Sequence, residues 1–154
     1  MNVNHICEKE MSSASNEADV YYQAKVLKKP HFSGPLPVHA DRNITCEYRE
    51  CMTNGLFISC LQGDNCFAVD DDIGLVQNII VCDAVYKQFT QSKSFFHAPL
   101  DSSILGIHTV SALSAVVKCA SVSSIHKKFV LLPRDIDYIA IPLLHAGSLN
   151  IICQ

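Results

Sequence analysis

Residues 123–136 read SSIHKKFVLLPRDI, a stretch that carries two lysines, an arginine and an aspartate within the most apolar half of the chain. It lies between a long serine-rich apolar segment and a second apolar run. Pro133 suits the first position of a helix, and Asp135 would lie in its first turn, where the helix dipole stabilises a carboxylate. The stretch therefore predicts a polar loop at residues 126–131 followed by a short helix.

The bulk composition limits the class of protein. The chain has 154 residues, of which 49% are hydrophobic and 18% charged, so it fits one domain with a buried core. Its net charge is −3, whereas proteins that wrap nucleic acid by bulk electrostatics are strongly basic. The most apolar window, residues 102–122, contains His108 and Lys118 and is too polar for a membrane-spanning helix. We therefore expect no membrane span.

Shifts in composition divide the chain into five segments. Residues 1–27 predict a mobile polar tail, because they are rich in Ser, Asn and Glu and show no periodicity. Residues 28–61 begin as an extended, proline-rich segment and include a possible extra N-terminal helix. Residues 62–76 form an acidic insertion that contains a cysteine, residues 77–145 a helical core, and residues 146–154 an apolar C-terminal extension.

The spacing of apolar residues predicts a mostly α fold. Val85 and Phe89 recur at a four-residue step, which predicts a medium helix over 77–90. Apolar residues at steps of three or four predict a long helix over 102–125, and Pro133 and Pro142 bound a short one. Runs rich in β-branched residues (NIIV, AVV and FVLL) favour strands instead, so dominant strand content would exclude this prediction.

A medium, a long and a short helix in this order are the plan of the histone fold. In that frame SSIHKKFVLLPRDI resembles the second loop and the start of the last helix of core histones of the H-three type. Lys28-Lys29-Pro30-His31, followed by Pro35 and Val38, resembles the junction between the tail and the core of that family. Shorter matches lie within 53–61 and 89–104. The chain resembles a strongly diverged, H-three-like histone, related to the centromeric variants.

The resemblance implies a non-enzymatic chromatin component in the nucleus that forms a heterodimer with a histone of the H-four type. It implies weak DNA contacts from six residues: Lys28, Lys29, His31, Arg42, Lys127 and Lys128. It implies a partner-binding core of six apolar residues: Val85, Phe89, Ile107, Val110, Leu113 and Val117. His126 and Asp135 would pair in self-association through the last two helices.

Each of these roles has a simpler alternative. An ordinary solvated loop without a binding role would also contain polar residues such as Lys127 and Lys128. Asp135 could simply stabilise the first turn of a helix. The apolar faces also suit a self-contained bundle. The net negative charge and the scarcity of arginines depart from the histone pattern and place DNA binding in doubt. An unrelated small interaction module and a cytoplasmic location are the corresponding alternatives.

Cysteine chemistry provides a further alternative. The chain has eight cysteines and no apolar leader segment, so we expect an intracellular protein with reduced thiols. Cys46, Cys51, Cys60 and Cys66 are weak zinc candidates, because two of their three gaps (four, eight and five residues) exceed the two to four residues typical of structural sites. No catalytic motif occurs, so we expect neither enzymatic activity nor a cofactor.

Overall fold

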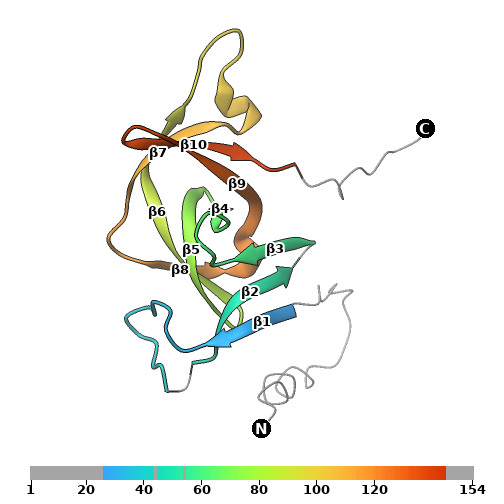
Figure 1. Ribbon diagram of the computed structural model, residues 1–154, viewed down its shortest axis with the longest axis vertical. Helices are drawn as coiled ribbons and strands as arrows, with labels where there is room; N and C mark the ends of the chain where they lie inside the picture. Colours follow the sequence, from blue (N-terminus) through green and yellow to red (C-terminus); the bar gives the residue numbers. More distant parts are fainter. Residues whose placement is uncertain (1–25, 44, 54, 145–154) are drawn as a thin grey trace, which may run out of the picture.

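The computed structural model describes residues 26–43, 45–53 and 55–144, and within them the chain consists of antiparallel β-strands (Figure 1). The strands are β1 (Val26–His31), β2 (Glu47–Thr53), β3 (Leu56–Ser59), β4 (Cys66–Val69), β5 (Asp72–Ile80), β6 (Asp83–Ser94), β7 (His108–Leu113), β8 (Lys118–Ser121), β9 (Ile125–Arg134) and β10 (Asp137–Pro142). The only helical elements among these residues are two short 3₁₀ turns, η2 (Ser102–Leu105) and η3 (Val122–Ser124). The predicted mostly α, histone-like fold is therefore wrong.

Six of the strands close into a ring, which we call the barrel. Its strands are hydrogen-bonded in the order β5, β4, β9, β10, β7 and β6, and an additional pairing of β5 with β6 completes the circle. Figure 1 shows these strands around a common centre. The stretch SSIHKKFVLLPRDI supplies β9, which lies between β4 and β10 rather than in a loop.

The remaining strands extend the barrel on the outside. β2 pairs with the end of β5 and carries β1 on one edge and β3 on the other, and we call these three strands the side sheet. β8 pairs with the first half of β6. In Figure 1 the side sheet lies below the barrel, with β1 farthest from it.

Two hydrophobic cores follow from this arrangement. The barrel core draws on all six ring strands and contains Cys66, Ala68, Phe89, Val110, Phe129 and Ala140, with Ile73, Leu75 and Leu131 packed against them. The outer core lies between the barrel wall, the side sheet and η3, and its fully buried members include Ile58, Phe67, Val69, Val76, Ile79 and Val122. Alternate residues of β4 enter different cores, as the two-residue period of a strand requires.

The four-residue spacing that predicted the helix over 77–90 has a simple physical explanation. A step of four matches the helical period of 3.6, but it is also twice the strand period of two. Val85 and Phe89 are both buried, yet they lie on one extended strand, β6. The same ambiguity misassigned 102–125, which contains η2, β7, β8 and η3, and 133–142, which contains the end of β9 and β10.

Two tight turns were missed, one because Val81 is not typical of turns and the other because Asp135 also suits the first turn of a helix. β5 and β6 are joined through Val81 and Cys82, and Val81 has a φ of 46°. Two-residue hairpins usually place Gly, Asn or Asp in that left-handed region, and a β-branched residue is rare there. Asp135, expected at the start of a helix, lies with Ile136 in the turn between β9 and β10 and has a φ of 50°.

A buried carboxylate ties the connection between β1 and β2 to β5. Glu47 is 1% exposed, and its Oε1 accepts hydrogen bonds from the Gly34 amide (3.0 Å) and from Asn78 Nδ2 (2.9 Å). Arg42 Nε lies 3.5 Å from its Oε2, and His31 Nε2 lies 3.0 Å from Asn78 Oδ1. A buried charge is tolerated only when it is paired and hydrogen-bonded, so this network fixes the path of the connection.

Gly34 is required for close packing against this network. A Cβ added there would lie 2.3 Å from the Cγ and Nδ2 atoms of Asn78, and Asn78 is fully buried.

No helix in the described part of the chain is both long and apolar enough to cross a membrane. Most of the predicted tail and all of the predicted C-terminal extension lie outside the described residues.

The outer core yields a stability prediction. Phe67 is fully buried, so Phe67→Ala should lower the free energy of unfolding by about 3–5 kcal/mol through lost burial and the cavity left behind. Phe32→Ala is the matched control, because Phe32 is 73% exposed, and it should change stability by less than about 0.5 kcal/mol. Urea unfolding followed by circular dichroism measures both values, and equal losses would contradict the two-core description.

Candidate functional site

One open end of the barrel contains a pocket with a volume of about 390 Å³. All six ring strands contribute to its wall, and the β3–β4 connection and the β9–β10 turn complete it. Its lining, which we call the apolar pocket, consists of Gln62, Gly63, Asn65, Cys66, Leu75, Phe89, Ser111, Ala112, Leu113, Leu131, Ile136 and Tyr138. None of these residues is an Asp, Glu, Lys, Arg or His, so the pocket carries no formal charge.

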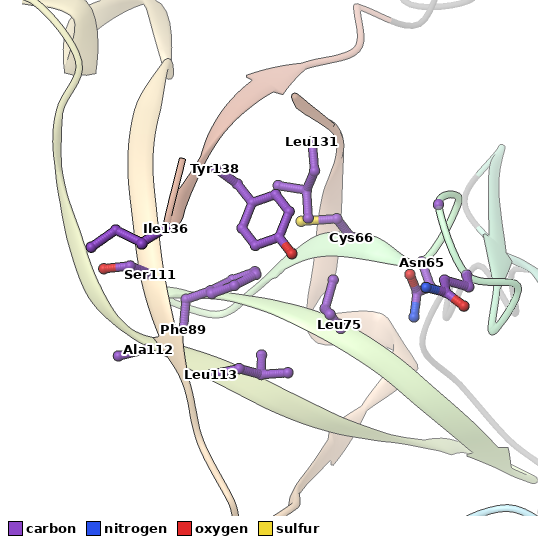
Figure 2. Close-up of a pocket in the computed structure, with 12 residues that line it drawn as sticks. Asn65, Cys66, Leu75, Phe89, Ser111, Ala112, Leu113, Leu131, Ile136 and Tyr138 are labelled. Carbon is purple, nitrogen blue, oxygen red and sulfur yellow. The ribbon is translucent and has the colours of Figure 1, made fainter. Parts of the chain in front are cut away.

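Two aromatic rings shape the pocket. Tyr138 on β10 and Phe89 on β6 have ring centroids 6.0 Å apart with an angle of 52° between the ring planes. Figure 2 shows the Tyr138 hydroxyl pointing into the space between Phe89 and Leu75. Phe89 is 5% exposed, whereas Tyr138 is 41% exposed, so Phe89 forms the floor and Tyr138 lies nearer the opening.

The apolar wall continues outward to an unusually exposed rim. Ile136 is 95% exposed and Leu113 is 41% exposed, and both side chains line the pocket. An apolar surface that gathers around a concave opening is more informative than scattered exposed leucines. It is the arrangement expected where an apolar group enters from solvent.

The few polar groups of the pocket differ in their availability. Asn65 Nδ2 donates a hydrogen bond to the Val76 carbonyl (2.9 Å), and Ser111 Oγ donates one to Gln91 Oε1 (3.1 Å). Among the described residues the hydroxyl of Tyr138 has no such partner. It is therefore, with the exposed amide of Gln62, a pocket group free to donate a hydrogen bond to a ligand, and it lies closer to the aromatic floor.

Cys66 is the pocket's thiol, and its surroundings keep it protonated. Burial raises the pKa of Cys66 to about 12, because a thiolate would be poorly solvated among apolar side chains. Burial also raises the pKa of Cys60 to about 12, with Arg49 opposing the shift and Glu50 adding to it. At neutral pH Cys66 is a small apolar side chain rather than a nucleophile.

The structure does not bring the six expected DNA-binding residues onto one surface. Lys29 pairs with Glu50 at the exposed edge of the side sheet, and His31 and Arg42 belong to the buried Glu47 network. Lys128 is 9% exposed, pairs with Asp64, and lies 5.6 Å from the centroid of the Phe67 ring. Lys28 lies on β1, and Lys127 faces the barrel at the end opposite the apolar pocket.

The expected self-association pair is also separated. His126 lies at the start of β9, where its Nδ1 is 3.2 Å from the Ser124 carbonyl oxygen, and Asp135 follows the end of that strand. A ten-residue strand separates the two by about 30 Å. Self-association through the last two helices is ruled out, because the residues predicted to form them, 102–125 and 133–142, form strands and short 3₁₀ turns instead.

The residues expected to bind a histone partner are distributed over the barrel and its outer connections. Val85, Phe89 and Val110 are buried within this chain, and Leu113 lies on the rim of the apolar pocket. Ile107 and Val117 are half-buried beside the ends of β7 and β8. The apolar surface that suggested a heterodimer is therefore largely buried within this chain.

The zinc candidates do not converge. Cys51 is buried in the outer core and Cys66 in the barrel core, on opposite faces of the barrel wall. Cys46 and Cys60 are half-buried in and beside the side sheet. Among the described residues, no three His, Cys, Asp or Glu side chains lie together in a way that could hold a metal ion.

Sequence analysis missed most of the pocket. Phe89, Leu113 and Cys66 were singled out for other roles, whereas Leu75, Leu131 and Tyr138 were not singled out at all. The available signal was weak: the last strand, DYIAIP, is a short apolar run with two β-branched residues, which is consistent with a strand but does not show that Tyr138 and Ala140 face inward.

The fold and the pocket define a small antiparallel β-barrel domain with an uncharged, apolar opening at one end. The chain belongs to the DUF8592 family, a domain of unknown function whose family model matches residues 30–143. No curated protein and no solved structure matches the chain. The histone resemblance and the chromatin role that it implied are thereby corrected, while the nuclear location stays a prediction.

The environment of Cys66 yields a prediction about thiol reactivity. At pH 8 a pKa of about 12 leaves about one thiol in ten thousand ionised, against about one in four for an ordinary thiol. The greater nucleophilicity of a more basic thiolate recovers part of this difference. Iodoacetamide should therefore alkylate Cys66 at least about fiftyfold more slowly than the exposed Cys82, as measured by mass spectrometry of the two peptides. In urea the two rates should converge, and similar rates in the native protein would contradict this environment.

Proposed function

We propose that this domain is a non-enzymatic binding domain whose apolar pocket holds a small, neutral, apolar molecule. The observation that carries the proposal is the lining of the pocket. Twelve residues, from all six ring strands and two connections, surround a volume of about 390 Å³, and none of them is formally charged. Ligand pockets commonly have volumes of about 300–1,000 Å³ and combine an apolar wall with a few polar groups.

The chemistry of the lining limits the class of ligand. A charged ligand would lose its hydration without gaining an opposite charge, so the pocket selects against ions. An aromatic or aliphatic ring would stack against Phe89 and Tyr138, and a carbonyl or ether oxygen would accept a hydrogen bond from the Tyr138 hydroxyl. The preferred ligand is therefore an uncharged ring compound with one acceptor group.

Simple energetics place the affinity in a measurable range. A ligand that buries about 250 Å² of apolar surface gains about 6 kcal/mol from the hydrophobic effect, from which the entropic cost of association is subtracted. Because the net gain is then below about 6 kcal/mol, dissociation constants weaker than about 40 μM are expected. The rigid wall of the barrel favours binding, because its strands need no reordering.

Binding without catalysis is favoured by the state of the pocket's reactive groups. The thiol of Cys66 is protonated at neutral pH, and no histidine or carboxylate lines the pocket to act as a base toward it. A nucleophilic site requires a base or a cation beside the nucleophile. The apolar pocket is thus suited to hold a molecule rather than to transform it.

The uncharged fluorescent dye N-phenyl-1-naphthylamine tests this proposal. Its emission should rise saturably on addition of the protein, with one dye per chain. Leu113→Trp should weaken dye binding at least about tenfold, because the indole ring would occupy the mouth of the pocket. Leu132→Trp is the matched control: Leu132 is 45% exposed, against 41% for Leu113, and it does not line the pocket.

Thermal unfolding of both variants establishes that they fold. Unchanged dye binding by Leu113→Trp, or an equal loss with Leu132→Trp, would show that the dye binds elsewhere on the apolar surface. Absence of any saturable signal with the unmodified protein would overturn the proposal.

A further inference from the structure

The opposite end of the barrel contains a second pocket of about 410 Å³ with different chemistry, which we call the polar pocket. Its lining consists of Ala68, Asp70, Asp71, Asp72, Ile73, Gln88, Phe89, Thr90, Ser92, His108, His126, Lys127 and Phe129. Phe89 lines both pockets, so its buried ring separates the two ends of the barrel.

Two nitrogen-bearing side chains face the interior at this end. Lys127 is opposite Ala68 in the pairing of β4 with β9, and His108 is opposite Ala140 in the pairing of β7 with β10. Residues opposite each other share a face of the sheet, and Ala68 and Ala140 both belong to the barrel core. Lys127 and His108 are themselves half-buried.

Gly106 lies beside the lysine. The Lys127 ammonium is 3.5 Å from the point that a Cβ at Gly106 would occupy, which is an ordinary contact distance, and Gly106 has a φ of 74° at the end of η2. This left-handed conformation favours glycine. The ammonium therefore lies beside the chain that leads into His108.

Neither group is neutralised within the described part of the chain. No ion pair or hydrogen bond holds the side chain of Lys127 or of His108 there, in contrast to Lys128 and Lys118, which pair with Asp64 and Asp72. Half-buried groups interact more strongly than exposed ones, because less water screens them. A half-buried ammonium that has no ion-pair partner is available to bind an anion.

The carboxylates around the polar pocket are mostly engaged elsewhere. Asp72 accepts hydrogen bonds from Tyr86 (2.9 Å) and Gln88 (2.7 Å) and pairs with Lys118 (3.0 Å). Asp101, which approaches His108 from the loop before η2, is held by Ser94, Ser103 and His97.

The remaining charged groups of the lining are exposed. Asp70 and Asp71 form the β4–β5 turn, and His126 is exposed at the start of β9. Salt screens exposed charges of this kind more effectively than half-buried ones. They weaken the attraction of Lys127 for an anion without cancelling it.

We propose that the polar pocket is an anion-binding site in which Lys127 and His108 hold a small oxyanion, a carboxylate or a phosphate group. The lysine ammonium provides the charge, and the imidazole donates a hydrogen bond from a ring N–H. The site is independent of the apolar pocket, because Phe89 separates them. A carboxylate and a phosphate would be held by the same two side chains, and separate titrations with acetate and inorganic phosphate distinguish them.

The site should bind its anion more tightly at lower pH. Burial, and next the charge of Lys127, lower the pKa of His108 from its ordinary value, while Asp101 opposes this shift. His108 is therefore neutral at pH 7.5, an ordinary assay value about one unit above the usual histidine pKa. A bound anion favours the imidazolium and binding takes up a proton, so affinity rises as the pH falls toward the pKa of His108.

Titration of the full chain with inorganic phosphate and, separately, with acetate tests the site, with sodium chloride holding ionic strength constant. The backbone amide signals of Gly106 and His108 in ¹H–¹⁵N spectra should shift saturably with at least one of the two anions, and the tighter one identifies the class. Lys127→Met should weaken binding at least about fivefold. Lys28→Met removes the same charge from the exposed β1 strand and should leave the affinity unchanged.

The histidine contribution has its own readout in the unmodified protein, which needs no variant. The ring C–H signals of His108 should titrate at a higher pH when phosphate or acetate is present. His108→Gln should abolish the rise in affinity for acetate, which stays ionised over this range, between pH 7.5 and about 5.5, whereas His39→Gln, outside the pocket, should retain it. Equal affinities for Lys127→Met and Lys28→Met, or a His108 titration unaffected by either anion, would overturn the proposal.

Discussion

The pairing of β5 with β6 is the interaction on which the rest of the structure depends. Without it the strands would form an open sheet, and the inward faces of β4, β7, β9 and β10 would have no common interior. The pairing shifts register between Val76 and Asn78, a β-bulge that lets one strand bend. On one side of the shift β5 closes the barrel, and beyond it β5 receives β2 and the side sheet.

Closure also explains why the two ends of the barrel differ. Along β9 the inward residues are Lys127, Phe129 and Leu131, so one strand passes from a charged end through an aromatic centre to an apolar end. The interior of a six-stranded ring is narrow enough for side chains to fill its middle. Phe89 and Phe129 do so, which leaves a shallow pocket at each end instead of one continuous channel.

Two buried charged residues hold the outer elements against the barrel. Glu47 is hydrogen-bonded at the base of the side sheet, and Lys128 pairs with Asp64 while lying against the rings of Phe57 and Phe67. Buried ion pairs contribute little net stability, but removing one partner is costly. Their effect is to specify where the connections before β2 and β4 run. Lys127 and Lys128, adjacent in sequence, thus serve opposite faces of one strand.

The sequence by itself indicated part of what avoids water: Val85, Phe89 and Val110, assigned to a partner-binding core from their apolar character, are buried within this chain, whereas Leu113 of the same set is 41% exposed. It did not determine their geometry, because a four-residue step fits both a helix and a strand, and Val81 conceals the turn that separates β5 from β6. The polar pocket depends on the pairing of Ala68 with Lys127 and of His108 with Ala140, residues far apart along the chain. Only the tertiary structure decided these pairings, because a two-residue apolar period indicates which face of a strand is buried but not which residue of a distant strand lies opposite.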